Sequence, residues 1–243
     1  MKIREKLFMS REELQKEGAI TIVVFGDSVS HGGLVGDIYH YDTVYWNRLR
    51  NKLMAVRNYV PVNVINAAIG GTSAKESVER LPKQVLTHCP DLVIVCFGLN
   101  DVNGTKEDYL SSMRTIFEAC QNSGSEVIFL TPNMLNTYVA EDVAEVHRSY
   151  AAVTAEFQNN GRMDDYIESA VALAESMGVA VCDCYSEWKK LSETQDITML
   201  LANRINHPTR EMHELFAQKL FEMILPEEAV KAIQNDDAMF RKA

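Results

Sequence analysis

The sequence lacks the features that mark several common classes of protein. No apolar run approaches the roughly 20 residues of a membrane-spanning helix, and the first residues carry scattered charges without the apolar core of a signal peptide. We therefore expect no membrane span and a cytoplasmic location. Basic residues are in deficit, since 24 Lys and Arg stand against 34 Asp and Glu, for a net charge of -10. Because most of this surface would repel a phosphate backbone, nucleic acid is not an expected partner.

Cysteine is scarce, and its spacing fits no framework. The five cysteines form neither an even disulfide set nor a repeated C-x-x-C pattern: Cys89, Cys96, Cys120, Cys182 and Cys184. Cys96 and Cys182 lie in apolar runs, which is typical of buried thiols in a reducing compartment. A metal site at Cys182 and Cys184 would need a second pair of ligands with matching spacing. We expect no metal and no other cofactor.

The nucleotide-binding motifs are missing as well. Neither G-x-G-x-x-G after the first strand nor G-x-x-x-x-G-K-[ST] anywhere is present. This disfavours a non-catalytic, flavodoxin-like binding protein whose glycine-rich turns hold a phosphate or flavin, although such turns can bind anions through their N–H groups. The binding protein stays open as an alternative function.

Short apolar runs rich in β-branched residues recur along the chain. They lie at residues 19–25, 62–68, 91–97, 126–131 and 178–183. Each run is continuous rather than alternating, as in strands buried on both faces of a parallel sheet. Segments between them carry apolar residues at helical spacing, including 46–56, 78–86 and 110–120. This alternation predicts an α/β sandwich with right-handed crossovers.

We expect residues 1–243 to form a single domain, because this length suits one domain with a substantial core. Residues 1–18 are predicted as a leading helical segment, in which Ser10 and Glu13 fit a capping box. Residues 227–243 are predicted as a C-terminal tail or helix.

The longest segment without a predicted strand, residues 135–177, is expected to be mostly helical, with a break at Asn159-Asn160-Gly161. A further helix is expected to begin at Pro208-Thr209, because proline is favoured in the first turn of a helix.

Polar, glycine-bearing turns follow the first three predicted strands. They read Gly26-Asp27-Ser28, Ile69-Gly70-Gly71-Thr72 and Gly98-Leu99-Asn100-Asp101. Parallel strands end at one edge of the sheet, where ligands bind, so these turns should converge. Acyl transfer needs a nucleophile, a base and donors for the developing oxyanion. Ser28 can attack, while its own N–H, the Gly71 N–H and the Asn100 amide can donate.

The base should be one of six histidines: His31, His40, His88, His147, His207 and His213. Only His207 lies in a loop past the fifth predicted strand and directly before a proline. That loop would return to the same edge of the sheet. His207 is therefore the expected general base.

Four separate blocks resemble those of the GDSL, or SGNH, hydrolases. They are GDS at Gly26–Ser28, NAAIGG at Asn66–Gly71, GLND at Gly98–Asp101 and NHP at Asn206–Pro208. The resemblance implies a flavodoxin-like three-layer α/β/α sandwich with a five-stranded parallel sheet. It also implies lipase-like serine esterase or acylhydrolase chemistry without metal. By position, Ser28 is the nucleophile, Gly71 and Asn100 complete the oxyanion hole with the Ser28 N–H, and His207 is the base.

One position departs from that family. Members usually carry an aspartate three residues before the histidine, whereas this sequence has Arg204, and the flanking Asn203 and Asn206 supply no carboxylate. We therefore predict a Ser28–His207 dyad whose imidazole Nδ1–H is held by a backbone carbonyl or an asparagine oxygen. Losing the acid should lower the rate.

Other residues near the blocks have supporting or open roles. Asp27 and Asp101 are expected to brace their turns through hydrogen bonds, and Asp183 or Glu187 remains a weaker alternative acid for the imidazole. Trp46 is expected in the core. The aromatic residues after the nucleophile turn could line a substrate pocket: Tyr39, His40, Tyr41 and Tyr45.

The sequence thus predicts a serine-dependent ester hydrolase that passes through an acyl–Ser28 intermediate. The expected substrates are small-molecule short-chain or O-acetyl esters, with acetylated carbohydrates first. Transfer of the acyl group to an alcohol or sugar through the same intermediate stays open. The α/β-hydrolase fold is disfavoured, because the sequence around Ser28 lacks the second glycine of G-x-S-x-G. The sequence gives no prediction for the oligomeric state.

Overall fold

The computed structural model of the chain describes residues 2–240, with side chains as far as residue 233. Five parallel strands form one sheet in the order β2-β1-β3-β4-β5. The strands are β1 (Ile20–Gly26), β2 (Val62–Asn66), β3 (Leu92–Cys96), β4 (Glu126–Leu130) and β5 (Ala180–Cys182). All five predicted strands are present. The last is shorter than its apolar run, because Asp183 already caps the helix that follows.

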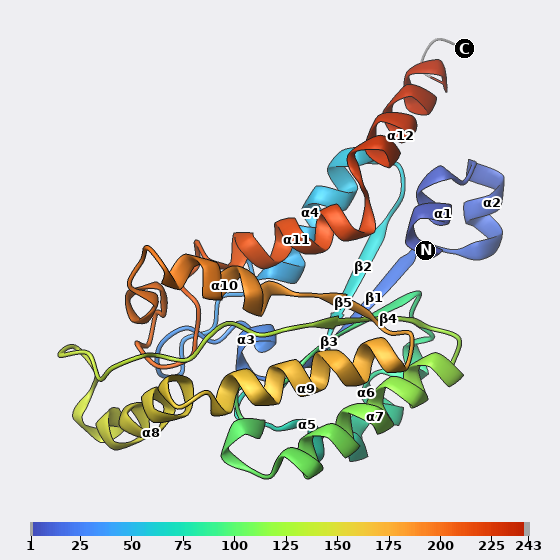
Figure 1. The fold of residues 1–243 in the computed structure, drawn as a ribbon. Coiled ribbons are helices and arrows are strands. Elements are labelled where there is room, and N and C mark those ends of the chain that lie inside the picture. Colours follow the sequence, from blue (N-terminus) through green and yellow to red (C-terminus); the bar gives the residue numbers. More distant parts are fainter. Residues whose placement is uncertain (1, 241–243) are drawn as a thin grey trace.

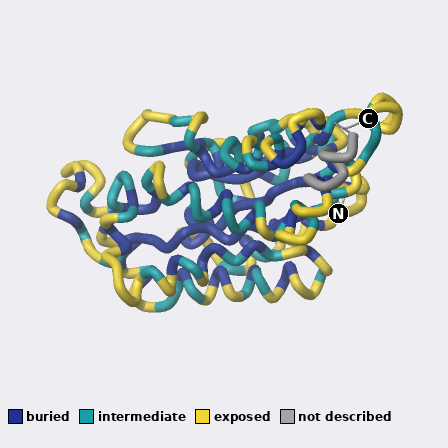
Figure 2. The backbone as a smooth tube through the Cα atoms, turned by 90° about the horizontal axis from the view of Figure 1, so that it is seen from above, coloured by how far each residue is buried: buried dark blue, intermediate teal, exposed yellow. Residues whose placement is uncertain are grey.

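Helices cover both faces of this sheet (Figure 1). Helices α4 (Tyr45–Val56) and α11 (His213–Ile224) lie on one face, and α7 (Lys106–Asn122) and α9 (Arg162–Ser176) lie on the other. Strand β3 is buried along its whole length, and Figure 2 shows the buried strands as the middle layer. The predicted three-layer α/β/α sandwich with a five-stranded parallel sheet is confirmed, because apolar strands with two covered faces need helices on both.

Shorter helices and turns complete the architecture. They are α1 (Lys2–Phe8), α2 (Arg11–Glu17), α3 (Ser28–His31), α5 (Ala74–Ser77), η1 (Val78–Arg80), α6 (Leu81–Gln84), η2 (Leu86–His88), η3 (Asp101–Asn103), η4 (Glu145–His147), α8 (Arg148–Asn159), α10 (Cys184–Ser192), η5 (Ile197–Leu200) and α12 (Glu227–Phe240). The expected capping box at Ser10 and Glu13 is formed at the start of α2. Ile3 and Leu7 of α1 are fully buried, so the leading segment joins the core.

The structure confirms one expectation about helices and corrects two others. Residues 135–177 are mostly helical, in α8 and α9, with the predicted break at 160–161, and only the first part of the segment, up to residue 144, is irregular. Residues 78–86 are not one helix but a series of short helical turns. No helix begins at Pro208: an antiparallel bridge joins it to Leu201, and α11 starts only at His213. The bridge holds the loop that carries His207, which local sequence preference could not indicate.

The C-terminal segment predicted as a tail or helix contains α12, and residues 241–243 of that prediction lie outside the described residues. Among the residues that are described, no helix is long and apolar enough to cross a membrane.

Candidate active site

Ser28 and His207 meet at the carboxyl edge of the sheet. Ser28 is the first residue of α3, directly after β1, and its Oγ lies 2.8 Å from His207 Nε2. The other ring nitrogen, Nδ1, lies 3.0 Å from the main-chain carbonyl oxygen of Leu34. A carbonyl can only accept a hydrogen bond, so Nδ1 carries the proton and Nε2 is free to accept from the serine hydroxyl. This is the arrangement a serine nucleophile and its base require.

Gly33 allows this close approach. A Cβ on Gly33 would lie 3.1 Å from the Ser28 carbonyl oxygen and 3.3 Å from His207 Cε1. Any larger residue would push against both partners of the dyad.

The imidazole of His207 is largely buried, and this burial lowers its pKa; the hydrogen bond to the Leu34 carbonyl opposes the effect. Burial disfavours the charged form of a histidine. The ring is therefore neutral near pH 7, as a general base must be.

Gly71 and Asn100 line the same hollow as Ser28 and His207, which has a volume of about 720 Å³. Gly71 has a φ of +79°, which glycine adopts without strain, and open space surrounds the position of a Cβ. One N–H of the Asn100 amide donates to the Thr72 carbonyl oxygen at 3.1 Å, so the second remains available to a ligand. The structure thus brings together the residues expected to form an oxyanion hole.

Asp27 and Asp101 lie behind the turns rather than in the hollow. Asp27 Oδ1 accepts from the Val29 N–H at 3.0 Å, and Asp101 Oδ1 accepts from the Ala74 N–H at 2.8 Å. Burial raises the pKa of Asp27 to about 7 and that of Asp101 to about 6. Each carboxyl caps a short helix and ties its turn, as the expected bracing role requires.

Asn203 organises the loop that presents His207. Its Oδ1 accepts from the N–H groups of Ile205, Asn206 and His207 at 3.0, 3.0 and 2.9 Å. Its Nδ2 donates to Asn206 Oδ1 at 2.9 Å. One side chain therefore fixes the backbone on both sides of the NHP block.

Arg204, at the position where an acid was expected, has different partners. Its Nε lies 3.0 Å from an Asp142 carboxylate oxygen, and its Nη1 donates to the carbonyl oxygens of Met199 and Leu201. The side chain therefore braces the loop from outside, while Nδ1 of the imidazole faces Leu34.

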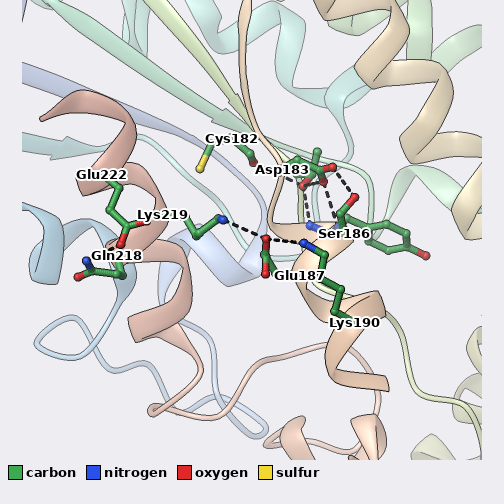
Figure 3. Close-up of polar contacts among 10 residues, drawn as sticks. Cys182, Asp183, Ser186, Glu187, Lys190, Gln218, Lys219 and Glu222 are labelled. Carbon is green, nitrogen blue, oxygen red and sulfur yellow. Dashed lines mark hydrogen bonds and ion pairs between the residues drawn. The ribbon is translucent and has the colours of Figure 1, made fainter. Parts of the chain in front are cut away.

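Asp183 and Glu187, the weaker alternatives for the acid that would orient His207, bind other partners (Figure 3). Asp183 Oδ1 accepts from Thr131 Oγ1 and from the Ser186 N–H, both at 3.1 Å. Glu187 pairs with Lys219 at 2.9 Å and with Lys190 at 3.1 Å. Since the Leu34 carbonyl oxygen is the partner of His207 Nδ1, neither carboxylate orients the ring.

The aromatic residues after the nucleophile turn separate into different roles. Tyr39 lines the hollow. Tyr45 is fully buried with its hydroxyl 2.8 Å from Ser30 Oγ, so a pocket role for it is wrong. His40 contacts Arg210, and Tyr41 lies beside His31.

Trp46 packs against the core but is only partly buried, and its Nε1 donates to the Ser30 carbonyl oxygen at 2.8 Å.

The expected partner of His207 Nδ1, a backbone carbonyl or an asparagine oxygen, is the main-chain carbonyl of Leu34. Which carbonyl is used could not be predicted, because no residue pattern indicates it. One contributor was missed by reasoning from the sequence. Asn133 is fully buried and donates to the carbonyl oxygens of Asn206 at 2.9 Å and Met134 at 2.8 Å. Asn133 follows β4 closely, so the edge rule that found the other turns could have found it.

Within the described part of the chain, no three His, Cys, Asp or Glu side chains are arranged to hold a metal ion.

Comparison with known proteins agrees with this geometry. The sequence model of the GDSL-like Lipase/Acylhydrolase family matches residues 24–215. None of the curated proteins matches the chain.

Several solved structures share the fold. The acetylxylan esterase Axe2 from Geobacillus stearothermophilus superposes with a TM-score of 0.65 at 20% identity, over 84% of this chain and 93% of that one. A lipase/acylhydrolase from Enterococcus faecalis gives a TM-score of 0.64 at 22% identity, over 84% and 95%. LAE5, an alpha/beta hydrolase enzyme from the metagenome of Lake Arreo, Spain, gives 0.64 at 19% identity, over 88% and 97%.

Proposed function

Since the chain belongs to the GDSL-like lipase/acylhydrolase family and is thus a carboxylic ester hydrolase, we propose that it cleaves short-chain O-acyl esters through an acyl–Ser28 intermediate. Carbohydrate O-acetyl esters are the leading substrate class. The observation that carries the proposal is the 2.8 Å approach of Ser28 Oγ to His207 Nε2, with Nδ1 of the same ring facing a carbonyl.

The first half-reaction acylates the serine. Ser28 Oγ attacks the ester carbonyl carbon while His207 Nε2 takes the hydroxyl proton. The negative charge on the carbonyl oxygen is stabilised by the N–H groups of Ser28 and Gly71 and by the Asn100 amide. When the intermediate collapses, the C–O bond to the alcohol breaks, and the imidazolium returns the proton to the departing oxygen.

The second half-reaction releases the acid. His207 takes a proton from water, whose oxygen attacks the acyl carbon, and the same donors stabilise the oxyanion. Collapse breaks the bond to Ser28 Oγ, which recovers its proton from the imidazolium. Serine and histidine then return to their starting states.

The lining of the hollow supports a polar, hydroxylated alcohol group. Tyr39, Tyr150, Asp37 and Asp142 are among the residues that line it. Aromatic rings offer an apolar face to a sugar, and carboxylates accept hydrogen bonds from its hydroxyls. The structural similarity to Axe2, an acetylxylan esterase, points in the same direction.

The test combines covalent labelling with turnover. Wild type, Ser28→Ala, His207→Ala and the exposed-serine control Ser192→Ala are treated with a fluorophosphonate and examined by intact mass, then assayed with p-nitrophenyl acetate. We expect one adduct on wild type and on the control, none on Ser28→Ala, and slow labelling of His207→Ala. Turnover by Ser28→Ala should fall at least about 10³-fold.

Acetylated xylo-oligosaccharides, compared with acetylated lysophospholipid, then test the substrate class. Absence of both adduct and turnover on wild type would overturn the proposed mechanism. If wild type forms the fluorophosphonate adduct but releases acetate faster from the lysophospholipid than from the xylo-oligosaccharides, only the carbohydrate assignment is overturned.

We also propose that the protein works in the cytoplasm. All five cysteines are free thiols, four of them buried, which suits a reducing compartment. Immunodetection after cell fractionation tests this, and recovery from the extracellular fraction would contradict it.

A further inference from the structure

His31 connects the nucleophile helix to the loop that carries the proposed oxyanion donor. It is the last residue of α3, three positions after Ser28. Its Nδ1 accepts a hydrogen bond from the Gly70 N–H at 3.1 Å. Its own carbonyl oxygen accepts from Asn66 Nδ2 at 3.4 Å. The side chain and main chain of one residue thus reach both ends of the 66–70 segment.

The ring of His31 is held in one orientation. It packs against the Tyr39 ring with centroids 4.4 Å apart, and Nε2 lies 3.4 Å from the Tyr41 hydroxyl. Since Nδ1 accepts from a backbone N–H, the ring proton must be on Nε2, where it faces the Tyr41 oxygen. Only the neutral imidazole can make both contacts.

Gly70 is the point at which this contact acts on the site. The peptide between Gly70 and Gly71 carries the Gly71 N–H, and two successive glycines leave its orientation weakly restrained by their own backbone preferences. Within the loop, the Thr72 N–H and hydroxyl both donate to the Ile69 carbonyl oxygen, at 3.4 and 2.8 Å, and close the turn around these glycines. The His31 contact fixes the preceding Ile69–Gly70 peptide, from which the Gly70–Gly71 peptide continues. The orientation of the Gly71 N–H therefore depends on the closed turn and on His31 together.

We propose that His31 is a positioning residue, whose neutral ring holds Gly70 so that the Gly71 N–H points at the oxyanion formed on attack by Ser28. The inference rests on the proposed function and extends it to a histidine that does not touch the reacting atoms. An oxyanion donor stabilises the transition state far more than the ground state. Loss of its alignment should therefore lower kcat and leave KM nearly unchanged.

The side chains around His31 favour its neutral state, which the contact to Gly70 requires. Tyr39 and Tyr41 come from the loop after α3, and Arg80 comes from η1. Burial lowers the pKa of His31, and the nearby Arg80 charge lowers it further. Protonation at acidic pH would replace the acceptor at Nδ1 with a donor and break the contact to Gly70. The acidic limb of the rate profile should therefore contain a second ionisation, besides that of His207.

The experiment compares wild type with His31→Ala, His31→Asn and a control at a remote, exposed histidine, His88→Ala. An asparagine oxygen can take the place of Nδ1 as acceptor but does not titrate. With p-nitrophenyl acetate we expect His31→Ala to lose about tenfold or more in kcat with KM within about twofold of wild type. His31→Asn should recover most of kcat, and its acidic limb should reflect a single ionisation where wild type shows two. His88→Ala should match wild type.

The outcomes separate this inference from the proposed function. An active, fluorophosphonate-labelled wild type with an equally active His31→Ala overturns the inference alone. So does a well-folded His31→Asn as impaired as His31→Ala, because ring packing on Tyr39 would then be the relevant contact. A wild type that neither labels nor turns over ester overturns the proposed function, and the positioning role with it.

Discussion

A main-chain carbonyl, that of Leu34, occupies the place at His207 Nδ1 where serine hydrolases with a triad have a carboxylate. In a triad the acid holds the imidazole in the correct tautomer and stabilises the imidazolium. The carbonyl performs the first task fully, because it can only accept. It performs the second weakly, since a dipole stabilises a cation less than a full negative charge does. We therefore expect a working site with a reduced rate rather than an inactive one.

The pH dependence of the rate follows from the burial of His207. Because burial lowers its pKa from 6.5, the neutral base persists into mildly acidic solution. We expect kcat/KM to fall only as the pH drops below 6.5 and to stay level from there to about pH 8. Initial rates with an uncharged ester between about pH 4.5 and 9 measure this. An acidic limb centred above 6.5 would show that the ring is stabilised as a cation.

Tyr39 limits the space beside Ser28, the proposed nucleophile. A Cβ placed on Gly70 would lie 3.1 Å from the Tyr39 hydroxyl and 3.6 Å from Ser28 Cβ, so the ring ends close to this serine. We expect Tyr39→Ala to raise the ratio of kcat/KM for p-nitrophenyl propionate over acetate by about tenfold, since the one added methylene changes discrimination in such a pocket by about that factor or more. Tyr59→Ala, at an exposed tyrosine, is the matched control. An unchanged ratio would place the acyl group elsewhere.

At the scale of elements, the loop of residues 201–208 is held by contacts from a distant segment. The Ile205 carbonyl oxygen accepts from the Asn136 N–H at 2.9 Å, and the Asn206 carbonyl oxygen accepts from Asn133. Ile205 also packs into a small apolar cluster of its own: Ala140, Val143 and Ala151. The irregular segment after β4 thus supports the loop that carries His207, and its Asn136 N–H donates to that loop instead of to a helical partner.

Two neighbouring variants separate the internal from the external support of that loop. Asn203→Ala removes the acceptor of three backbone N–H groups and should lower the free energy of unfolding by about 1–3 kcal/mol, with a fall in kcat. Arg204→Asn introduces a residue type that tolerates the left-handed φ of +59°. It removes the ion pair with the exposed Asp142 and the hydrogen bonds to the Met199 and Leu201 carbonyl oxygens. Its cost should be about 1–2 kcal/mol, with kcat within a few fold.

Urea unfolding and steady-state kinetics on both variants provide the comparison. If Arg204→Asn proved the more damaging of the two for kcat, the guanidinium would have a direct role in the reaction.

At the scale of the whole molecule, two buried ionisable groups make the free energy of unfolding depend on pH in opposite directions. Burial, with smaller effects from Arg48 and His207, lowers the pKa of His213 to about 3. Its Nδ1 accepts from the Tyr45 N–H at 3.3 Å, which only the neutral ring can do. The stability that it contributes is complete above 6.5 and is lost as the pH falls toward 3. Asp27 acts in the other direction, because its pKa is raised.

Measurements on Asp27→Asn at several pH values test the pH dependence of stability that we attribute to Asp27. Between pH 3.8 and about 7 the unfolded chain releases the Asp27 proton while the folded chain keeps it, so rising pH favours unfolding of wild type. An asparagine does not ionise. The stability of the variant relative to wild type should therefore increase across this range, by at most about 4 kcal/mol.

Denaturant unfolding at several pH values, with the exposed Asp42→Asn as control, measures the difference. A difference independent of pH would mean that Asp27 is ionised in the folded protein at all of these values.

Much of the fold and of the candidate site could be predicted from local patterns. Short continuous apolar runs bounded by turn residues indicated the parallel strands, of which β2 and β5, at the edges of the sheet, are only partly buried. The turn after each strand lies at the same edge of the sheet, so Ser28, Gly71 and Asn100 could be grouped from the sequence. The start of α11 could not be predicted, because the bridge between Leu201 and Pro208 overrides the preference of proline for a first helical turn.

The order of residues along the chain was enough to predict an α/β sandwich and the set of residues gathered at one edge of its sheet, because both follow from periodicity and from residue types adjacent in the chain. The three-layer form of the sandwich was implied by the resemblance to the GDSL hydrolases. What holds these residues in place emerged only on folding: the Leu34 carbonyl at His207, 173 positions away, and the His31 ring at Gly70. Such contacts depend on how distant loops pack together. A carbonyl group is common to every residue, so no sequence pattern distinguishes the one that the folded chain uses.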